Sequence, residues 1–237
     1  MTEWKPKRFW KTAAPLGAAG GAYSISLDGR PVKTPAKAPL VVPSRALAEA
    51  LAEEWNAVED EIRPQAMPLT RAANAAIDKV VPQRDAVVTH LAEYGATDLL
   101  CYRAEGPEDL VRRQAEGWDP LLDWAAERFG ARLATTRGVV HLAQPADSLA
   151  RLRAQVQALG PFPLTALSEL VTLSGSLVIG LAAVHGAAAG EALWRLSRID
   201  EDWQAELWGV DPEAAALAED KRRAFHQAIK FFSLSET

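Results

Sequence analysis

The chain has 237 residues, of which 49% are hydrophobic and 24% are charged, as in an ordinary globular protein. A chain of this length buries on the order of 70% of its unfolded surface, so it needs neither a disulfide nor a metal ion to fold. The formal net charge of −5 argues against nucleic acid as a partner, because a phosphate-binding surface needs a clustered excess of basic residues.

Residues 1–65 are predicted to form a small β-rich domain. Residues 23–27 alternate apolar and polar side chains, as a half-buried strand does. Asp28-Gly29 is a strong tight-turn signal, after which the chain can return as a strand over residues 32–34. Residues 8–11 and 39–42 are predicted as further short strands.

A first helix is predicted to follow these strands. Ser44 is a favourable N-cap, and the helix is expected to run to about Asn56. Leu47, Leu51 and Trp55 would lie on one stripe of this helix and face the core.

Residues 66–237 are predicted to form a larger, all-helical domain, so the expected fold class is α+β with a boundary near Pro64. The predicted helices cover residues 72–80, 83–94, 107–118, 119–129, 148–159, 199–208 and 212–232. Gly130 is expected to end the fourth of them, Ser148 to cap the fifth, and Asp211 with Pro212 to begin the last. Residues 132–134 and 139–142 flank a turn and are predicted to form a small hairpin.

Residues 170–190 contain no charged side chain, a length close to that of a membrane span. Four glycines and several polar residues lower the hydrophobicity of this stretch, and no basic cluster flanks it. We therefore predict one or two fully buried helices, in which glycine allows close approach of a neighbour, and no stable membrane insertion. A peripheral membrane protein remains the alternative for this stretch.

Catalytic and cofactor motifs do not emerge from the sequence. Cys101 has apolar neighbours and is predicted to be a buried, unreactive thiol. The four histidines are scattered without metal-ligand spacing, and His185 is expected to be a hydrogen-bonded core residue. No phosphate loop, dinucleotide-binding turn or nucleophile elbow is present, so no cofactor is predicted. Paired carboxylates in the helical domain leave a small-molecule hydrolase or transferase as the alternative function.

The most informative segment is the predicted helix over residues 199–208. It carries four carboxylates, at Asp200, Glu201, Asp202 and Glu206, and two tryptophans, at Trp203 and Trp208. Tryptophan supplies a large contact area and acids orient a basic partner, so this composition is typical of a surface that binds another protein.

The two tryptophans are five residues apart, which separates them by about 140° around a helix. One is therefore expected to pack inward and the other to border an exposed surface, with both in the core as the alternative. Trp55, which also lies beside acids, is added to the candidate partner-binding residues.

Several short motifs, in this order and at these separations, resemble the Atp12 family of assembly chaperones for the F1 part of ATP synthase. They include Arg8-Phe-Trp-Lys, Leu27-Asp-Gly-Arg-Pro-Val-Lys-Thr-Pro, Glu54-Trp, Met67-Pro-Leu-Thr-Arg-Ala-Ala-Asn, Tyr94-Gly-Ala-Thr-Asp-Leu-Leu-Cys-Tyr, Trp118-Asp-Pro-Leu-Leu-Asp-Trp and Trp203-Gln to Trp208-Gly. The resemblance covers nearly the whole chain.

The resemblance implies a non-enzymatic chaperone that binds the unassembled F1 α subunit and shields its β-facing surface until the β subunit displaces it, without ATP hydrolysis. It also implies a β-rich domain joined to a helical one, and a functional role for acids of the late helix. We expect a monomer. The N-terminus lacks the apolar core of a secretory signal and contains an early acid, so a bacterial cytosol is expected, with the mitochondrial matrix for eukaryotic relatives.

Overall fold

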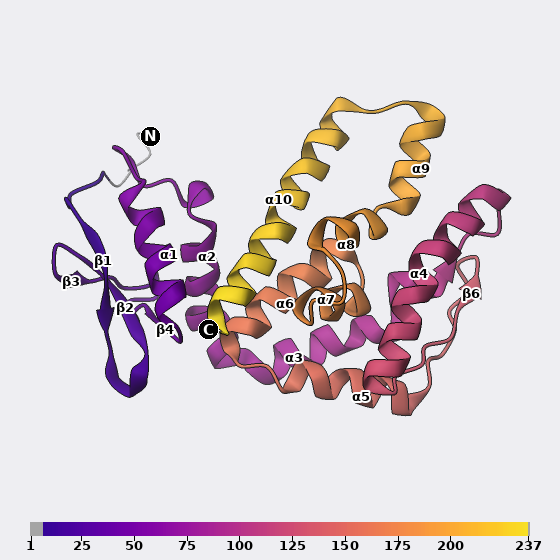
Figure 1. Ribbon diagram of the computed structural model, residues 1–237, viewed down its shortest axis with the longest axis horizontal. Coiled ribbons are helices and arrows are strands. Elements are labelled where there is room, and N and C mark those ends of the chain that lie inside the picture. The colour runs from indigo at the N-terminus through magenta and orange to yellow at the C-terminus, as the bar shows by residue number, and fades with distance from the viewer. Residues whose placement is uncertain (1–6, 237) are drawn as a thin grey trace. The chain divides into compact units, whose positions relative to one another are not determined.

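The computed structural model describes residues 7–236, which form two compact units (Figure 1). Unit 1 contains the chain up to Arg84 together with residues 160–166 and the residues from Lys230 onward. Unit 2 contains residues 85–159 and 167–229. The predicted α+β class is confirmed, since a small N-terminal sheet precedes a mostly helical remainder. The boundary between residues 65 and 66 falls inside unit 1 and stays a prediction. The N-terminal residues from which the absence of a secretory signal was predicted lie partly in residues 1–6, outside the described residues.

Unit 1 contains a four-stranded antiparallel sheet whose central strand is β2 (Tyr23–Leu27), as predicted. Its neighbours are β1 (Ala13–Gly17), β3 (Arg30–Pro31) and β4 (Val41–Val42). Asp28 and Gly29 both have positive φ, at 47° and 82°, which matches the right-handed twist of a two-residue hairpin.

Three details of the predicted sheet are wrong. The returning strand is β3 and not residues 32–34, and residues 39–42 shorten to β4. Residues 8–11 form no strand, because the Arg8 guanidinium donates to the carbonyls of Trp10, Asn56 and Lys11 and so fixes this segment through its side chain. The strand β1 has a sequence, Ala-Ala-Pro-Leu-Gly, that carries no β pattern of its own.

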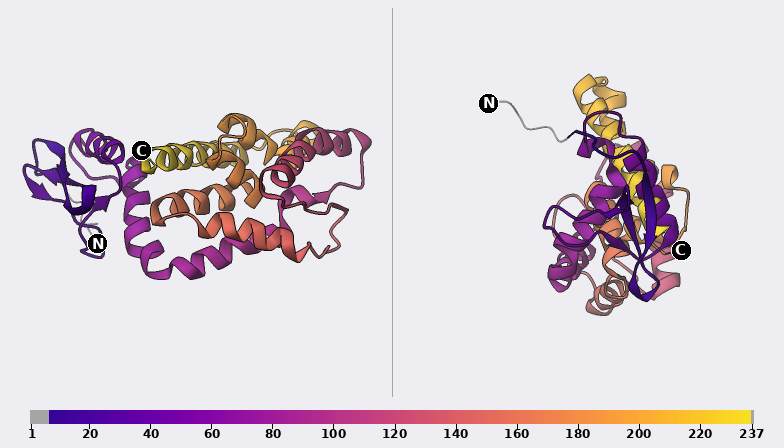
Figure 2. Two further views of the ribbon diagram at one scale, coloured as in Figure 1. Left: turned by 60° about the horizontal axis from the view of Figure 1, so that its bottom comes forward. Right: turned by 90° about the vertical axis from the view of Figure 1, so that its left-hand side faces the viewer.

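The helix α1 (Arg45–Asn56) begins as predicted at Ser44, whose Oγ accepts a hydrogen bond from the Leu47 N–H at 3.0 Å. It packs on β1 and β2, and Figure 2 shows it beside the sheet. Leu47 and Leu51 are fully buried in the core of unit 1.

A second helix of unit 1, α2 (Pro68–Ala75), starts earlier than predicted because a side chain from α1 caps it. The two carboxylate oxygens of Glu54 accept hydrogen bonds from the N–H groups of Leu69 and Thr70, both at 2.8 Å. These are orphan donors at a helix N-terminus, where a negative charge is also favourable.

Unit 2 is mostly helical, and a two-stranded parallel sheet joins β5 to β6. Its elements include α3 (Arg84–Glu93), β5 (Tyr102–Arg103), α4 (Glu108–Phe129), β6 (Thr136–Arg137), α5 (Ala146–Gln157), α6 (Pro161–Ser174), α7 (Leu177–Val184), α8 (Gly190–Leu196), α9 (Ile199–Trp208) and α10 (Pro212–Ser235). Arg84 of α3, the first residues of α6 and the last of α10 belong to unit 1.

Three predictions for unit 2 are corrected. The helices expected over 107–118 and 119–129 are one helix, α4, because buried Trp118 and Leu121 anchor the chain on both sides of Pro120. The expected hairpin is absent from the described residues: β6 pairs in parallel with β5, and residues 139–142 are not a strand. Ser148 lies inside α5 and donates to the Arg132 carbonyl, so it does not cap the helix.

The uncharged stretch over residues 170–190 forms the end of α6, a turn at Gly175, all of α7 and the start of α8. Every residue of α7 from Leu177 to Ala183 is buried, as predicted. A Cβ atom at Gly180 would lie 2.7 Å from Val171 Cγ2, so this glycine does permit close approach of α6. Within residues 7–236 no helix has the length and apolar character needed to span a bilayer.

The start of α7 is held by a buried carboxylate. Asp98 has no exposed surface, and its oxygens accept hydrogen bonds from Ser176 Oγ at 2.7 Å and from the Val178 N–H at 3.0 Å. Ser176 in turn caps α7 by accepting from the Ile179 N–H.

Candidate partner-binding surface

Six of the seven predicted partner-binding residues lie on α9. Its first turn contains Asp200, Glu201 and Asp202, where negative side chains are favoured by the helix dipole. The helix ends at Gly209, which has φ 90° and ψ 160°, a backbone conformation that is essentially restricted to glycine.

One side of α9 is attached to α4 by polar contacts. Gln114 donates from Nε2 to Asp200 Oδ1 at 2.6 Å, and Arg113 donates from NH1 to Glu206 at 2.7 Å. The Arg113 guanidinium also lies 4.8 Å from the centre of the Trp203 ring, a cation–π contact. The hydrogen bond from Arg113 lowers the pKa of Glu206, so this carboxylate stays ionised and bound to its partner. Asp200, Trp203 and Glu206 therefore hold α9 in place.

Apolar side chains at the start of α9 also pack against α4, at Gly117. A Cβ atom there would lie 2.7 Å from Leu196 Cδ2 and 2.9 Å from Ile199 Cδ1. Beside it, the buried Trp118 donates from Nε1 to the Leu196 carbonyl at 2.7 Å. The start of α9 is thus packed directly against the α4 backbone.

The other two acids of α9 face outward. Glu201 is exposed and accepts a hydrogen bond from Arg198 one turn away at 2.7 Å. Asp202 is also exposed, and among the described residues its carboxylate has no hydrogen-bond or ion-pair partner, although its N–H donates to the Arg198 carbonyl at 2.8 Å. Partial desolvation raises the pKa of Asp202, and the nearby Glu206 carboxylate adds to the increase, whereas Arg198 opposes it.

The tryptophans of α9 behave as the helical period predicts. Trp203 is half-buried beneath Arg113, whereas Trp208 is 79% exposed. The alternative with both tryptophans in the core is wrong, since no residue of α9 is buried; Trp208 is the outward one, and Trp203 packs inward only in part.

The seventh residue, Trp55, belongs to α1 in unit 1 and is not on the same element. It is half-buried, and its ring lies 5.1 Å from that of Trp10 in an edge-to-face contact within the core of the unit. Its role in binding stays a prediction.

The structure also shows the surroundings of the other groups considered in the sequence analysis, namely the cysteine, His185 and possible metal ligands. Cys101 is buried, as predicted, and burial raises the pKa of its thiol to about 12, so it is a poor nucleophile. His185 is not the predicted core residue: it is exposed, its ring lies 5.2 Å from that of Phe129, and partial desolvation lowers its pKa. Among residues 7–236 no group of three or more His, Cys, Asp or Glu side chains is arranged to hold a metal ion.

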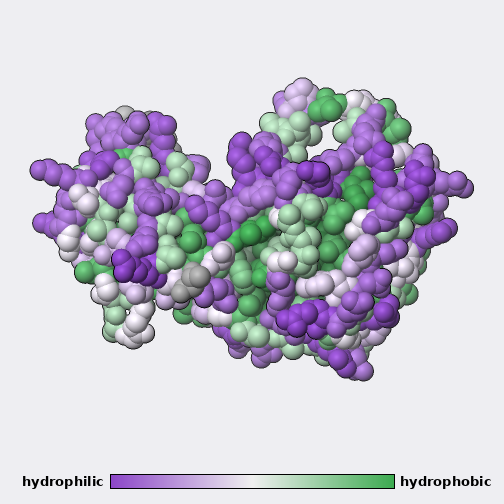
Figure 3. Space-filling model, in the orientation of Figure 1, coloured by the Kyte–Doolittle hydropathy of each residue, from purple (hydrophilic) through white to green (hydrophobic). Residues whose placement is uncertain are grey.

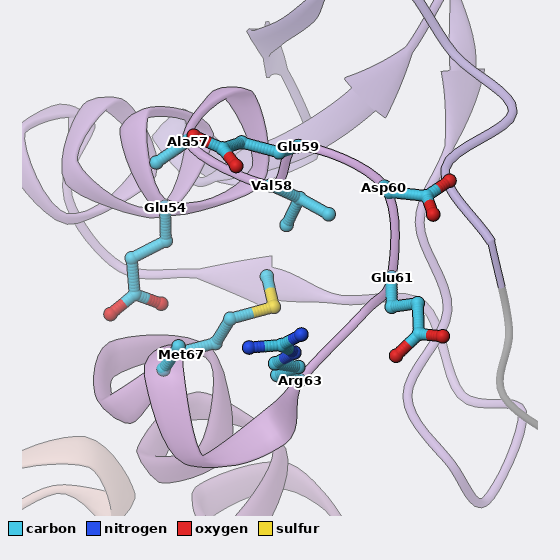
Figure 4. Close-up of a pocket in the computed structure, with 9 residues that line it drawn as sticks. Glu54, Ala57, Val58, Glu59, Asp60, Glu61, Arg63 and Met67 are labelled. Atoms are coloured by element: carbon cyan, nitrogen blue, oxygen red, sulfur yellow. The ribbon is translucent and has the colours of Figure 1, made fainter.

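A cavity of about 380 Å³ lies in unit 1 between the end of α1 and the start of α2 (Figure 4). Its charged lining residues are Glu54, Glu59, Asp60, Glu61 and Arg63. Figure 4 shows the carboxylates of Glu54 and Asp60 on opposite sides, and Glu54 is already engaged in capping α2. The carboxylates therefore surround the cavity without converging on one point.

Comparisons with known proteins identify the family of this chain. A model of the ATP12 chaperone protein family matches residues 7–126, about half of the chain. Atp12 from Paracoccus denitrificans is 52% identical, with a TM-score of 0.94 over 97% of this chain and 98% of that one. The chain belongs to the ATP12 chaperone family.

Two further solved structures are equally similar in fold. A D202K mutant of the same Paracoccus denitrificans ATP12 protein is 51% identical over 97% of each chain, with a TM-score of 0.94. The Atu1473 protein of Agrobacterium tumefaciens is 40% identical over 98% of this chain and 87% of that one, again with a TM-score of 0.94. Both relatives are bacterial proteins.

Sequence reasoning missed five residues on or next to the candidate surface. They are Arg113 and Gln114, which fix α9, and the exposed apolar residues Leu207, Val210 and Leu217. The first two are distant in sequence, so no local pattern could pair them with α9. The other three could have been found from the run of residues 206–217, which has no apolar stripe facing a core.

Proposed function

We propose that this ATP12 chaperone binds the unassembled F1 α subunit. It shields the surface that this subunit later presents to the β subunit, and it releases the α subunit during F1 assembly without hydrolysing ATP. The observation that carries the proposal is that one helix, fixed to α4, presents the exposed Trp208 at its end and the outward carboxylates Glu201 and Asp202 in its first turn.

The chemistry of α9 suits a reversible protein partner. An orphan subunit exposes an apolar interface that favours aggregation. An exposed tryptophan can cover part of such an interface, and acids beside it orient a basic partner and raise its association rate. Because the polar contacts of Asp200 and Glu206 fix α9 before binding, little conformational entropy is lost when the partner docks.

The direct test is the aggregation of isolated F1 α subunit, followed by light scattering, with and without an equimolar amount of this protein and with no nucleotide added. We expect the protein to suppress aggregation, and adding F1 β subunit should then release it, as seen by size-exclusion chromatography. Equal aggregation rates in the two samples would contradict the proposal.

Charge reversal of the outward acids provides the first prediction. Glu201→Lys with Asp202→Lys should slow association with the F1 α subunit, more strongly at low salt than at high salt, because exposed charges act within a screening length of about 8–10 Å. Association rates measured by stopped-flow or biolayer interferometry test this. Glu116→Lys with Glu127→Lys, an equal charge change at exposed positions of α4, is the matched control. Equal effects of the two double variants would remove the α9 acids from the surface.

A further inference from the structure

The junction between α9 and α10 is exposed along its whole length. Every residue from Glu206 to Leu217 is exposed, which includes the end of α9, the connecting residues and the first turns of α10. Four large apolar side chains lie there, and we call them the tip cluster: Leu207, Trp208, Val210 and Leu217 are 56%, 79%, 69% and 57% exposed. Figure 3 shows small hydrophobic patches at this end of the two helices, with polar residues between them.

Local contacts give this junction a defined backbone. Gly209 makes a turn in a conformation that other residues rarely adopt. Asp211 accepts a hydrogen bond from the Glu213 N–H at 2.9 Å, and Pro212 occupies the first helical position. The tip cluster is therefore presented by capped helix ends.

The tip cluster contributes little to the fold, because its side chains keep most of their surface in water. A helix end that is exposed on all sides is normally polar. An apolar cluster with a polar border is instead typical of an interaction site, and tryptophan is among the residues most enriched at the energetic centre of interfaces.

The charges around the tip cluster define the partner that it fits. From Ile199 to Asp220 the chain contains eight acidic residues and no lysine or arginine. Four of these acids pair with Arg113, Arg198, Arg222 and Arg223 outside this range, so the negative charge near the tip cluster comes mainly from Asp202, Asp211 and Glu213. A complementary surface has an apolar centre and lysine or arginine at its edge. A second copy of this chain would bring like charges together at the same place.

We propose that the tip cluster is the apolar anchor of the chaperone surface and receives an apolar segment of the F1 α subunit that is flanked by basic residues. The proposal rests on the function proposed above and extends the surface beyond α9, onto the connecting residues and the start of α10. It adds Leu207, Val210 and Leu217 to the binding residues.

The test replaces three members of the tip cluster by polar residues, in the variant Leu207→Gln, Val210→Ser, Leu217→Gln. The apparent affinity for isolated F1 α subunit should fall by roughly tenfold or more, as for the loss of an interface centre. The control is Val139→Ser with Val140→Ser, since these two valines are 97% and 74% exposed in the segment between β6 and α5. The control should bind the F1 α subunit as the unmodified protein does.

The outcomes separate this inference from the proposed function. If the unmodified protein and the tip variant protect the F1 α subunit equally, the tip cluster is not its anchor and the proposed function stands. If the unmodified protein gives no protection, both proposals fail. If sedimentation velocity shows a dimer that the tip variant lacks while protection is unchanged, the occupant is a second copy, and the inference is overturned.

A labelling experiment gives a second readout that does not depend on the triple variant. The chain has a single cysteine, the buried Cys101, so Leu217→Cys introduces one accessible thiol for an environment-sensitive dye. Addition of F1 α subunit should shift the dye emission to shorter wavelength, whereas a dye at Val139→Cys should not respond. An unchanged emission at position 217 during binding would overturn the inference.

Discussion

Asp98 is a carboxylate whose ionisation is set by two opposing effects. Complete burial raises its pKa to about 6, because the charged form loses its hydration. Hydrogen bonds from Ser176 Oγ and from the N–H groups of Val178 and Leu100 favour the charged form and limit the increase. The bonds from Ser176 and Val178 also join the turn before β5 to the start of α7. The ionisation of Asp98 therefore affects how firmly these two segments are held together.

The pKa of Asp98 predicts how stability depends on pH. In the unfolded chain the pKa is about 3.9, so between about pH 4 and pH 6 the folded state binds the proton more tightly. The contribution of Asp98 to the free energy of unfolding should therefore decrease as the pH rises through this window and stay constant above it.

Asp98→Asn should remove that pH dependence. It should also lower the free energy of unfolding at pH 7 by about 1–3 kcal/mol, because the amide places a donor against the donors that the carboxylate accepts. Urea denaturation at several pH values measures both effects, with the exposed Asp123→Asn as control. The same pH profile in Asp98→Asn and the unmodified protein would contradict this account.

For the residues of α9, the sequence indicated which tryptophan is more exposed, but it gave no indication of which side chains bind the acids of this helix. The five-residue spacing of Trp203 and Trp208 predicts their different environments, because helix geometry alone sets the angle between them. The polar partners of α9 lie 86 and 93 positions away along the chain, at Gln114 and Arg113, and only the tertiary fold brings them to Asp200 and Glu206.

At the scale of elements, the position of α9 depends on a glycine in its neighbour. Gly117 leaves room for Leu196 and Ile199 against the backbone of α4, and both side chains would have to move for even a methyl group. This close approach also brings Trp203 beneath Arg113.

Gly117→Leu should therefore displace α9 and lower the free energy of unfolding by about 1–3 kcal/mol, the usual cost of overpacking. Chemical denaturation measures the loss, and hydrogen exchange should show faster exchange of the α9 amides. Glu116→Leu places the same side chain at the adjacent, exposed position and should change stability by less than about 0.5 kcal/mol. Similar costs for the two variants would show that α4 and α9 do not need this close approach.

Elements were predicted well where the signals are local. The cap at Ser44, the turn at Asp28-Gly29 and the helix stop at Gly130 are all observed, because each depends on residues within one turn of chain. The pairing of β5 with β6 was missed, since the two strands are 34 residues apart and the intervening turn signal suggested a hairpin. The continuous helix α4 was missed because the buried contacts of Trp118 and Leu121 outweigh the local effect of Pro120.

At the scale of the whole molecule, unit 1 is assembled from three separate stretches of chain. Phe231, from the last stretch, is 1% exposed in the core of unit 1 and stacks on Phe162, from the middle stretch, at a ring distance of 6.2 Å. The hydroxyl of Ser44 also donates to the Leu234 carbonyl. No sequence pattern indicated that residues 160–166 and those after Lys230 complete the N-terminal unit.

Phe231→Ala should thus destabilise unit 1, although the substitution lies near the other end of the chain. We expect a loss of about 3–5 kcal/mol, as for other buried phenylalanines, and faster hydrogen exchange at the amides of β1 and β2. Lys230→Ala, at the preceding exposed position, is the control. Unchanged protection of β1 and β2 in Phe231→Ala would show that the last stretch is dispensable for the sheet.

The fold class and the family were accessible from the sequence because both rest on many weak signals spread over the chain. A β-rich start and a helical remainder follow from hydrophobic periodicity, and the ordered motifs point to the family that the comparisons identify. The division into discontinuous units follows from long-range packing, which periodicity does not encode.

The discontinuity of unit 1 has a consequence for biosynthesis. Ribosomes translate Phe231 only after every residue of unit 2, so the nascent sheet and α1 lack part of their apolar cover while the intervening stretch is made. At about 5–20 residues per second this interval lasts on the order of ten seconds. This member of a chaperone family therefore passes through a period during translation in which its own apolar surface is incompletely covered.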